Sequence, residues 1–211
     1  MKKLLTAALL ALASNPLLAS PLNEYQARWA EIKYQLDEQR QEKAFAHLRN
    51  EIRQELAVRP NDPPFLIWSA IISASYAGAR GGLGALKYVK EARSELEQAL
   101  TLDDDALDGS AYTSLGSLYY QVPGWPIGFG NDDKAETMLQ KALSINPDGI
   151  DPNFFYGDFL LGQKRYAESV RYLEAALKAP ERPGRGLADK GRREEARQRL
   201  EQARQGLAAA H

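Results

Sequence analysis

Residues 110–147, SAYTSLGSLYYQVPGWPIGFGNDDKAETMLQKALSINP, carry the pattern that decides the fold. Apolar and small residues recur there at helical spacing on both sides of an interruption, at Tyr112, Leu115, Gly116, Tyr119, Ala135, Leu139, Ala142 and Pro147. Gly116 and Ala135 are small enough to let two helices cross closely, and Pro147 cannot continue a helix. The segment therefore predicts two helices that pair as a hairpin.

The same spacing continues on both sides of this segment. Downstream it is clear, at Gly157, Tyr166, Ser169, Leu173, Ala176, Leu177 and Pro180. Upstream it is degenerate, because Ile72 takes the place of the small residue and Asp104 that of the proline. Strict alternation of apolar and polar residues, which would predict strands, is missing. Since two-helix units bury their apolar faces by stacking, the pattern predicts an all-α chain.

These spacings resemble the tetratricopeptide repeat (TPR) over about residues 24–180. The resemblance implies a right-handed superhelical stack of helical hairpins, a TPR-like α-solenoid, in residues 20–180. Residues 181–211 are expected to form a loop and a C-terminal capping helix, whose thin apolar stripe is Leu187, Ala196, Leu200, Ala203 and Leu207. End repeats need a polar outer face, so we expect the many charges of this helix to lie in solvent.

Residues 1–19 have the pattern of a secretory signal peptide. Lys2 and Lys3 give a positive start, an apolar stretch follows, and small residues come after Pro16. Cleavage after Ala19 or after Ala13 fits, and an uncleaved membrane anchor is the alternative, although the apolar stretch falls short of about 20 residues. Periplasmic or secreted localisation is the expectation, without a transmembrane segment after cleavage.

The composition excludes several classes of function. With 27 basic and 28 acidic side chains in 211 residues, the chain has no electrostatic reason to bind nucleic acid. It contains no cysteine and two histidines, so thiolate metal sites, disulfides and the lipid-modified cysteine of a lipoprotein are absent. No phosphate loop, dinucleotide fingerprint, EF-hand or nucleophile elbow is present. We therefore expect no enzyme, no catalytic residue, no cofactor and no metal.

Two insertions depart from the regular repeat, around Ala79–Val89 and Val122–Asn131. Both fall between the first and second helix of a unit, so both should project from one edge of the stack as extended loops. They carry exposed apolar candidates, namely Leu83, Trp125 and Phe129. Two readings stay open. The apolar side chains fold back onto the hairpin core, or they form an apolar ligand pocket or docking surface.

The run Trp125–Gly130 and the later Asn146–Asn153 are similar to exported TPR proteins related to the T-component associated with TRAP solute transporters. This narrower resemblance implies a hydrophobic ligand cavity and leaves homo-oligomerisation open. Members of that family typically carry a lipid anchor, which the missing cysteine places in doubt here.

First helices of TPR hairpins line the concave surface of the stack. Tyr112 and Tyr119 match packing positions of the repeat, whereas Tyr120, Asn153 and Asp158 fall off the packing face and are expected to line the groove. Tyrosine and asparagine suit recognition, because they offer broad contact and adaptable hydrogen bonds.

The sequence thus predicts an exported, non-catalytic TPR scaffold that binds a protein or peptide partner through its concave face and extended loops. The alternative is a solute-binding accessory protein of a TRAP-type transport system, which holds a small apolar or amphipathic ligand near Leu83, Trp125 and Phe129.

Overall fold

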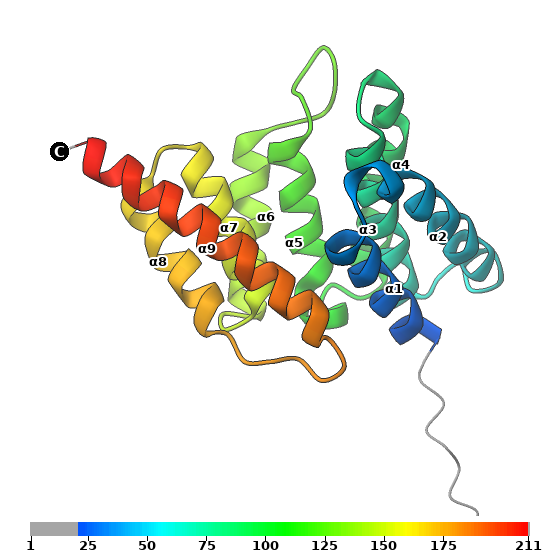
Figure 1. The fold of residues 1–211 in the computed structure, drawn as a ribbon. Helices are drawn as coiled ribbons and strands as arrows, with labels where there is room; N and C mark the ends of the chain where they lie inside the picture. The colour runs from blue at the N-terminus through cyan, green and yellow to red at the C-terminus, as the bar shows by residue number, and fades with distance from the viewer. Residues whose placement is uncertain (1–20, 211) are drawn as a thin grey trace, which may run out of the picture.

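The computed structural model describes residues 21–210, so the predicted signal peptide lies outside the described part of the chain. Within it, the structure is all-α (Figure 1). The helices are α1 (Pro21–Gln35), α2 (Glu38–Val58), α3 (Pro63–Arg80), the 3₁₀ turn η1 (Leu83–Ala85), α4 (Leu86–Leu102), α5 (Ala106–Gln121), α6 (Asp132–Ile145), α7 (Ile150–Gly162), α8 (Tyr166–Lys178) and α9 (Gly186–Ala209).

Two of the described helices begin at capping residues. The Asp62 side chain accepts a hydrogen bond from the Phe65 N–H at the start of α3, and the Asn131 side chain accepts one from the Lys134 N–H at the start of α6. Both are standard N-caps that satisfy backbone donors of the first turn. Gly81 ends α3 at a φ of 66°, in the left-handed region that favours glycine. These signals set the lengths of the paired helices.

Consecutive helices pair as α3/α4, α5/α6 and α7/α8, and the pairs stack along the chain. The glycines of the repeat pattern lie where the paired helices cross. A Cβ on Gly116 would lie 2.5 Å from Leu139 Cγ, and one on Gly157 would lie 2.7 Å from Leu173 Cγ. Both leucines are fully buried. The predicted TPR-like hairpin stack and the role of its glycines are therefore confirmed.

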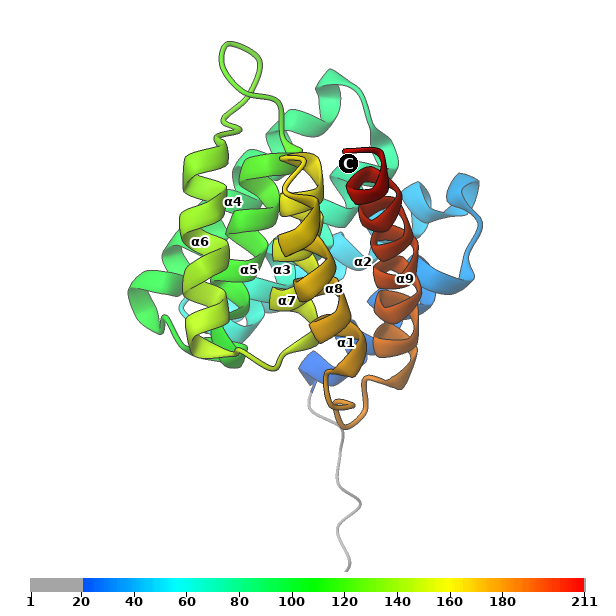
Figure 2. The ribbon, with the colours of Figure 1, turned by 90° about the vertical axis from the view of Figure 1, so that its left-hand side faces the viewer.

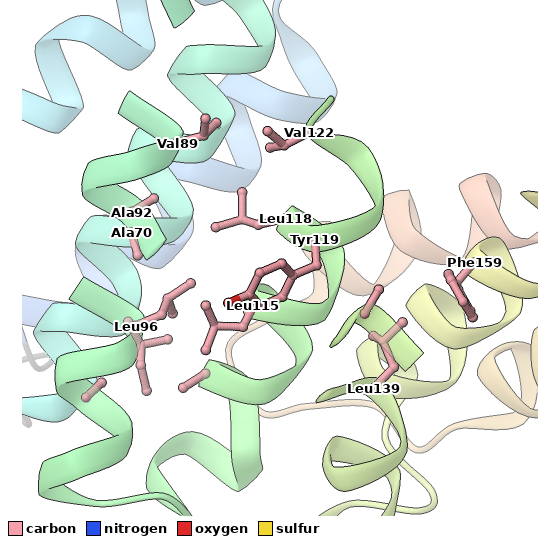
Figure 3. Close-up of a cluster of buried hydrophobic side chains, with 14 of the residues drawn as sticks. Ala70, Val89, Ala92, Leu96, Leu115, Leu118, Tyr119, Val122, Leu139 and Phe159 are labelled. Carbon is pink, nitrogen blue, oxygen red and sulfur yellow. The ribbon is translucent and has the colours of Figure 1, made fainter. Parts of the chain in front are cut away.

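The main core lies between successive hairpins. Figure 3 shows Leu115, Leu118 and Tyr119 of α5 pointing toward Leu96 and Val89 of α4. The cluster continues to Leu139 of α6, so one apolar layer joins three helices. Burial of this layer fixes the register of each hairpin on the next.

Helix α9 caps the last hairpin, as expected. It runs alongside α8 in Figure 2, and Ala196, Leu200 and Ala203 are buried against Leu173 and Ala176 of α8. Its N-terminal half also contacts α1, which belongs to the opposite end of the chain. The stack of hairpins is therefore bridged from its first helix to its last.

The two insertions differ in structure. The second is a loop over residues 122–131 that projects at the top of Figure 1. The first is mostly helical, because α3 continues to Arg80 and α4 begins at Leu86, leaving a short connection that contains η1. The expectation of an extended loop from Ala79 to Val89 was wrong. The glycines supply a tight turn between two lengthened helices.

Candidate functional site

The first helices of the hairpins, together with α1 and α9, surround a cavity of about 1590 Å³, called here the central cavity. The cavity is wide along α3 and α5 because these helices line it with small residues. These are Ala74, Ser75, Gly78, Ser110, Thr113, Ser114 and Ser117. The α5 wall therefore presents hydroxyl groups. The rest of the lining includes aromatic and charged side chains from α1, α7, α9 and the segment before α9.

One side of the central cavity is formed by the contact between α1 and α9, called here the α1–α9 closure. The Tyr34 ring packs directly against Gly191. A Cβ added to Gly191 would lie only 2.4 Å from Tyr34 Cδ1. The Tyr34 hydroxyl donates to a Glu195 carboxylate oxygen at 3.2 Å, and Lys33 Nζ lies 3.8 Å from the same carboxylate. Burial raises the pKa of Tyr34 well above its ordinary value, so the phenol stays a donor.

Two tryptophans lie beside this contact. Trp29 of α1 and Trp68 of α3 meet edge to face, with ring centroids 5.8 Å apart. The Trp29 indole N–H donates to Ser75 Oγ at 2.8 Å, which fixes the ring against the α3 wall. Both rings are buried, and both contribute to the lining of the central cavity.

A network of half-buried charges lies where α7 meets α9. Asp151 accepts hydrogen bonds from Arg182 at 2.7 Å and from Arg192 at 2.9 Å. Burial on its own would raise the pKa of Asp151, but the two guanidinium groups outweigh it and lower the pKa to about 2. Arg192 also pairs with Glu195 at 2.6 Å, which connects the network to the α1–α9 closure.

The network orders the segment before α9. Asp189 is fully buried and accepts hydrogen bonds from the Arg182 backbone N–H and the Arg182 Nε, each at 2.8 Å. Arg192, which is 9% exposed, covers the rings of Phe154 and Phe155 at 4.5 Å. The expectation that the charges of α9 all lie in solvent was therefore wrong. Part of the helix carries buried pairs because it faces α7 and α1.

The structure brings two of the predicted groove residues together. The Tyr120 hydroxyl donates to Asp158 Oδ2 at 2.8 Å, and Arg199 Nε lies 2.8 Å from Asp158 Oδ1. Asp158 and Arg199 line the central cavity, whereas Tyr120 lies behind them against Phe159. Burial, and then the Asp158 charge, raise the pKa of Tyr120. Tyr120 thus orients Asp158 rather than lining the cavity.

Asn153 does not line the groove. It is 2% exposed, and its side-chain amide donates to the Pro147 carbonyl at 2.7 Å and to the Gly149 carbonyl at 2.8 Å. The side chain therefore holds the connection between α6 and α7. The predicted position was wrong because sequence spacing cannot show that two loop carbonyls need a donor at this place.

The apolar candidates of the two insertions take different positions. Phe129 folds back, with its ring edge to face with Tyr119 at 5.8 Å and covered by Arg93 at 4.8 Å. Leu83 and Ile127 are 76% and 54% exposed and line the rim of the central cavity. Trp125 is 90% exposed. Phe129 thus folds back onto the hairpin core, as the first interpretation predicted. Leu83 and Ile127 lie at the cavity, as the second interpretation predicted.

Several cavity residues were missed from the sequence, namely Trp29, Tyr34, Trp68, Arg182, Arg185 and Arg192. Trp68 lies on α3, in a unit whose repeat pattern is degenerate, and the others come from the two ends of the chain, where the repeat pattern is weakest. A signal was present in Gly191, a glycine in the interior of a charged helix, since such a residue often marks a close approach.

Over residues 21–210, His, Asp and Glu side chains form no group of three or more that could hold a metal ion. None of the helices described is both long and apolar enough to cross a membrane.

The fold and the cavity define an all-α, TPR-like stack of hairpins around a concave space that is open to solvent on one part of its rim. No protein-family model matches the chain, and no curated protein matches it. Among solved structures, the chain is similar to the crystal structure of MamA, with 20% sequence identity and a TM-score of 0.45. The similarity covers 82% of this chain and 95% of that chain.

Proposed function

We propose that this protein is an exported, non-catalytic scaffold that binds a segment of a partner protein in its central cavity. The observation that carries the proposal is the cavity itself, about 1590 Å³ lined by side chains from both ends of the chain and from three hairpins. Pockets for small ligands typically measure roughly 300–1,000 Å³. The larger space favours several residues of a peptide over one small molecule.

The chemistry of the walls suits a peptide. Hydroxyl and amide groups of α5, at Ser110, Ser114, Ser117 and Gln121, offer partners for the unpaired backbone groups of an extended segment. The aromatic rings of Trp29 and Phe155, which also line the cavity, offer broad apolar contact for its side chains. Export rests on residues 1–19, and N-terminal sequencing of the protein from its native cell tests it by showing cleavage after Ala19 or Ala13.

A cavity-filling substitution tests the proposal. Gly78 lines the cavity, and a Cβ built there meets nothing within 4 Å, so Gly78→Leu starts in open space and extends into the cavity. Gly162→Leu is the matched control, because Gly162 also has open space at its Cβ but lies outside the cavity. A photo-crosslinking amino acid at Ser117 reports occupancy of the cavity, and one at exposed Lys141 reports the outer face.

We expect a polypeptide cross-linked from Ser117 but not from Lys141 in the native exported fraction. Gly78→Leu should reduce its yield at least about tenfold, while Gly162→Leu should leave the yield unchanged. Equal yields from both crosslinker positions, or an unaffected yield in Gly78→Leu, would contradict the proposal.

The second candidate is a solute-binding accessory protein of a TRAP-type system, similar to the T-component. It is favoured by the α1–α9 closure, which bounds the cavity, and by the exposed Leu83 and Ile127 at its rim. Native mass spectrometry of the mature protein separates the two candidates. A stoichiometric non-protein adduct supports solute binding, and a retained polypeptide supports the scaffold; the same spectrum gives the oligomeric state.

A further inference from the structure

Two uncharged segments of the chain project from one end of the hairpin stack, and they are called here the apolar tips. The first is the turn 81–85 between α3 and α4, and the second is the loop 122–131 between α5 and α6. Figures 1 and 2 both show them at the same end of the molecule. Residues of each tip line the central cavity, so a surface that contacted both tips would face this part of the cavity rim.

The apolar tips carry large side chains that lie in solvent. Trp125 is 90% exposed, Leu83 76% and Ile127 54%. Within residues 21–210, the other exposed large apolar side chains are Val58 and Leu102, at the ends of α2 and α4. Exposed apolar side chains that gather in one place mark an interaction site, whereas scattered ones need no explanation. The tips are therefore the part of the described surface where a partner is expected.

The second tip pairs its backbone groups internally. The N–H groups of Ile127 and Gly128 donate to the Gly124 carbonyl oxygen at 3.1 and 3.0 Å. The Gly130 N–H donates to the Pro123 carbonyl oxygen at 3.0 Å. The two prolines of the loop have no N–H that needs an acceptor. Because these groups are paired or missing, the loop loses little hydrogen bonding when it leaves water.

We propose that the apolar tips insert into the interfacial layer of a lipid bilayer, so that the protein binds a membrane with this end of the stack. Tryptophan suits this layer, because its ring is apolar while its indole N–H can bond to headgroups. A protein partner is less favoured, since protein interfaces carry about ten hydrogen bonds and the tips present mainly apolar side chains. A bilayer asks only that the tips reach one plane.

The charges beside the apolar tips have both signs. Lys87 is exposed just after the first tip, and Asp132, Asp133 and Lys134 are exposed just after the second. Long side chains such as lysine can keep their charge among the headgroups while the neighbouring tip is inserted. Since the signs are mixed, attraction to an anionic membrane adds little. The inserted tips are therefore the main source of affinity.

This inference goes beyond the proposed scaffold function, because it states where the scaffold works. Leu83 and Ile127 lie on the tips and also at the cavity rim, so membrane binding brings that part of the rim to the bilayer surface. The proposal does not depend on what the cavity binds.

The test measures binding of the mature protein to vesicles of phosphatidylcholine alone and to vesicles with about one quarter phosphatidylglycerol. Flotation gives the bound fraction. Tryptophan emission reports the surroundings of Trp125, because Trp29 and Trp68 are buried. The variants are Trp125→Ser and Leu83→Ser. Val58→Ser is the matched control, since Val58 is also 76% exposed but lies outside the tips.

We expect the wild type and Val58→Ser to float with both kinds of vesicle and to show a blue shift of the emission. Trp125→Ser should lower the partition coefficient at least about tenfold, and Leu83→Ser about fivefold, as for loss of one inserted apolar side chain. Brominated acyl chains should quench the wild-type emission. Phosphatidylglycerol should raise binding by less than about threefold, because the tips carry no charge.

The contrary outcomes are distinct. No flotation of the wild type overturns the proposal, and flotation that both tip variants retain overturns the assignment to the tips. Flotation that requires phosphatidylglycerol would mean that charge and not insertion drives binding. A blue shift that appears without vesicles and grows with protein concentration would assign the tips to a second copy of the chain. None of these results depends on the cross-links from Ser117, so the two proposals can fail separately.

Discussion

The α5/α6 hairpin and the α1–α9 closure each contain a large side chain packed against a glycine, but the surroundings of the two contacts differ. In the α5/α6 hairpin, Leu139 packs where Gly116 leaves room, and in the α1–α9 closure, Tyr34 packs where Gly191 leaves room. Leu139 is fully buried among apolar side chains. Tyr34 is half-buried, meets the Trp29 ring edge to face, and is hydrogen-bonded to the charged Glu195, 161 residues away in sequence.

The difference separates the scaffold from the site. A contact between neighbouring helices closes a short loop and is supported by apolar burial, which does not depend on pH or salt. A contact between the chain ends closes the whole stack and depends on ion pairs, which do. We infer that the hairpins form the stable frame, whereas the closure around the central cavity responds to conditions.

The largest effect on stability is expected from a substitution in the hairpin core. Leu139→Ala removes a fully buried side chain from the core between α5 and α6 and leaves a cavity that the helices cannot fill. The free energy of unfolding should fall by about 2–5 kcal/mol. Chemical denaturation followed by circular dichroism measures it. Ser114→Ala, on the cavity wall of α5, is the control and should change stability by less than about 0.5 kcal/mol.

The two glycines test the comparison directly. Ala at Gly116 or at Gly191 places a Cβ within 2.5 Å of the facing side chain, so each should cost about 1–3 kcal/mol locally. Gly116→Ala should lower global stability, because the hairpin core is the frame. Gly191→Ala should displace Tyr34 and speed hydrogen exchange in α1 while α5 to α8 stay protected. Equal global destabilisation by both would show that closure and frame unfold as one unit.

The sequence predicted the hairpin contacts and missed the closure for a physical reason. Gly116 and Leu139 take the same repeat positions as Gly157 and Leu173 once the insertion around Val122–Asn131 is set aside, so each pair supports the interpretation of the other. Tyr34 and Gly191 have no counterpart in the repeat, and their proximity depends on the curvature of the complete stack. Local patterns carry no information on that curvature.

The candidate site was predicted in part. Asp158 lines the central cavity, and Leu83 lies at its rim. Asn153 is instead a buried donor to loop carbonyls, and Phe129 is folded onto Tyr119. Asn153 and Phe129 depart from their predicted positions because each finds a contact partner within the fold. The sequence spacing does not reveal these partners. Arg185 was not singled out, since the many charges of the C-terminal segment were expected to lie in solvent.

The ion pairs of Asp151 predict that the stability of the fold depends on pH. The pKa of Asp151 is lowered from 3.8 to about 2 in the folded protein, so its ion pairs stabilise the fold above about pH 4. That stabilisation is lost as the pH falls from about 4 to 2, because protonation then removes the charge that Arg182 and Arg192 bind. Its size is roughly 1–2 kcal/mol after allowance for partial exposure.

Asp151→Asn isolates this group from other carboxylates that titrate in the same range. The variant should be less stable than the wild type at pH 6, and the difference should shrink toward pH 2. Urea denaturation at several pH values measures it. A difference that is constant over this range would mean that Asp151 contributes through hydrogen bonds alone.

The smallest expected effect concerns Lys33, which belongs to the same closure but lies at its exposed edge. Its Nζ is 3.8 Å from Glu195, and its side chain is 41% exposed. Water and salt screen such a pair, so Lys33→Gln should lower stability by roughly 0–1 kcal/mol, and 1 M NaCl should remove the difference. If Lys33→Gln instead opened α1 to hydrogen exchange as far as Gly191→Ala does, the exposed pair, and not the Tyr34 packing, would hold the closure. The central cavity would then be gated by ionic strength rather than by shape.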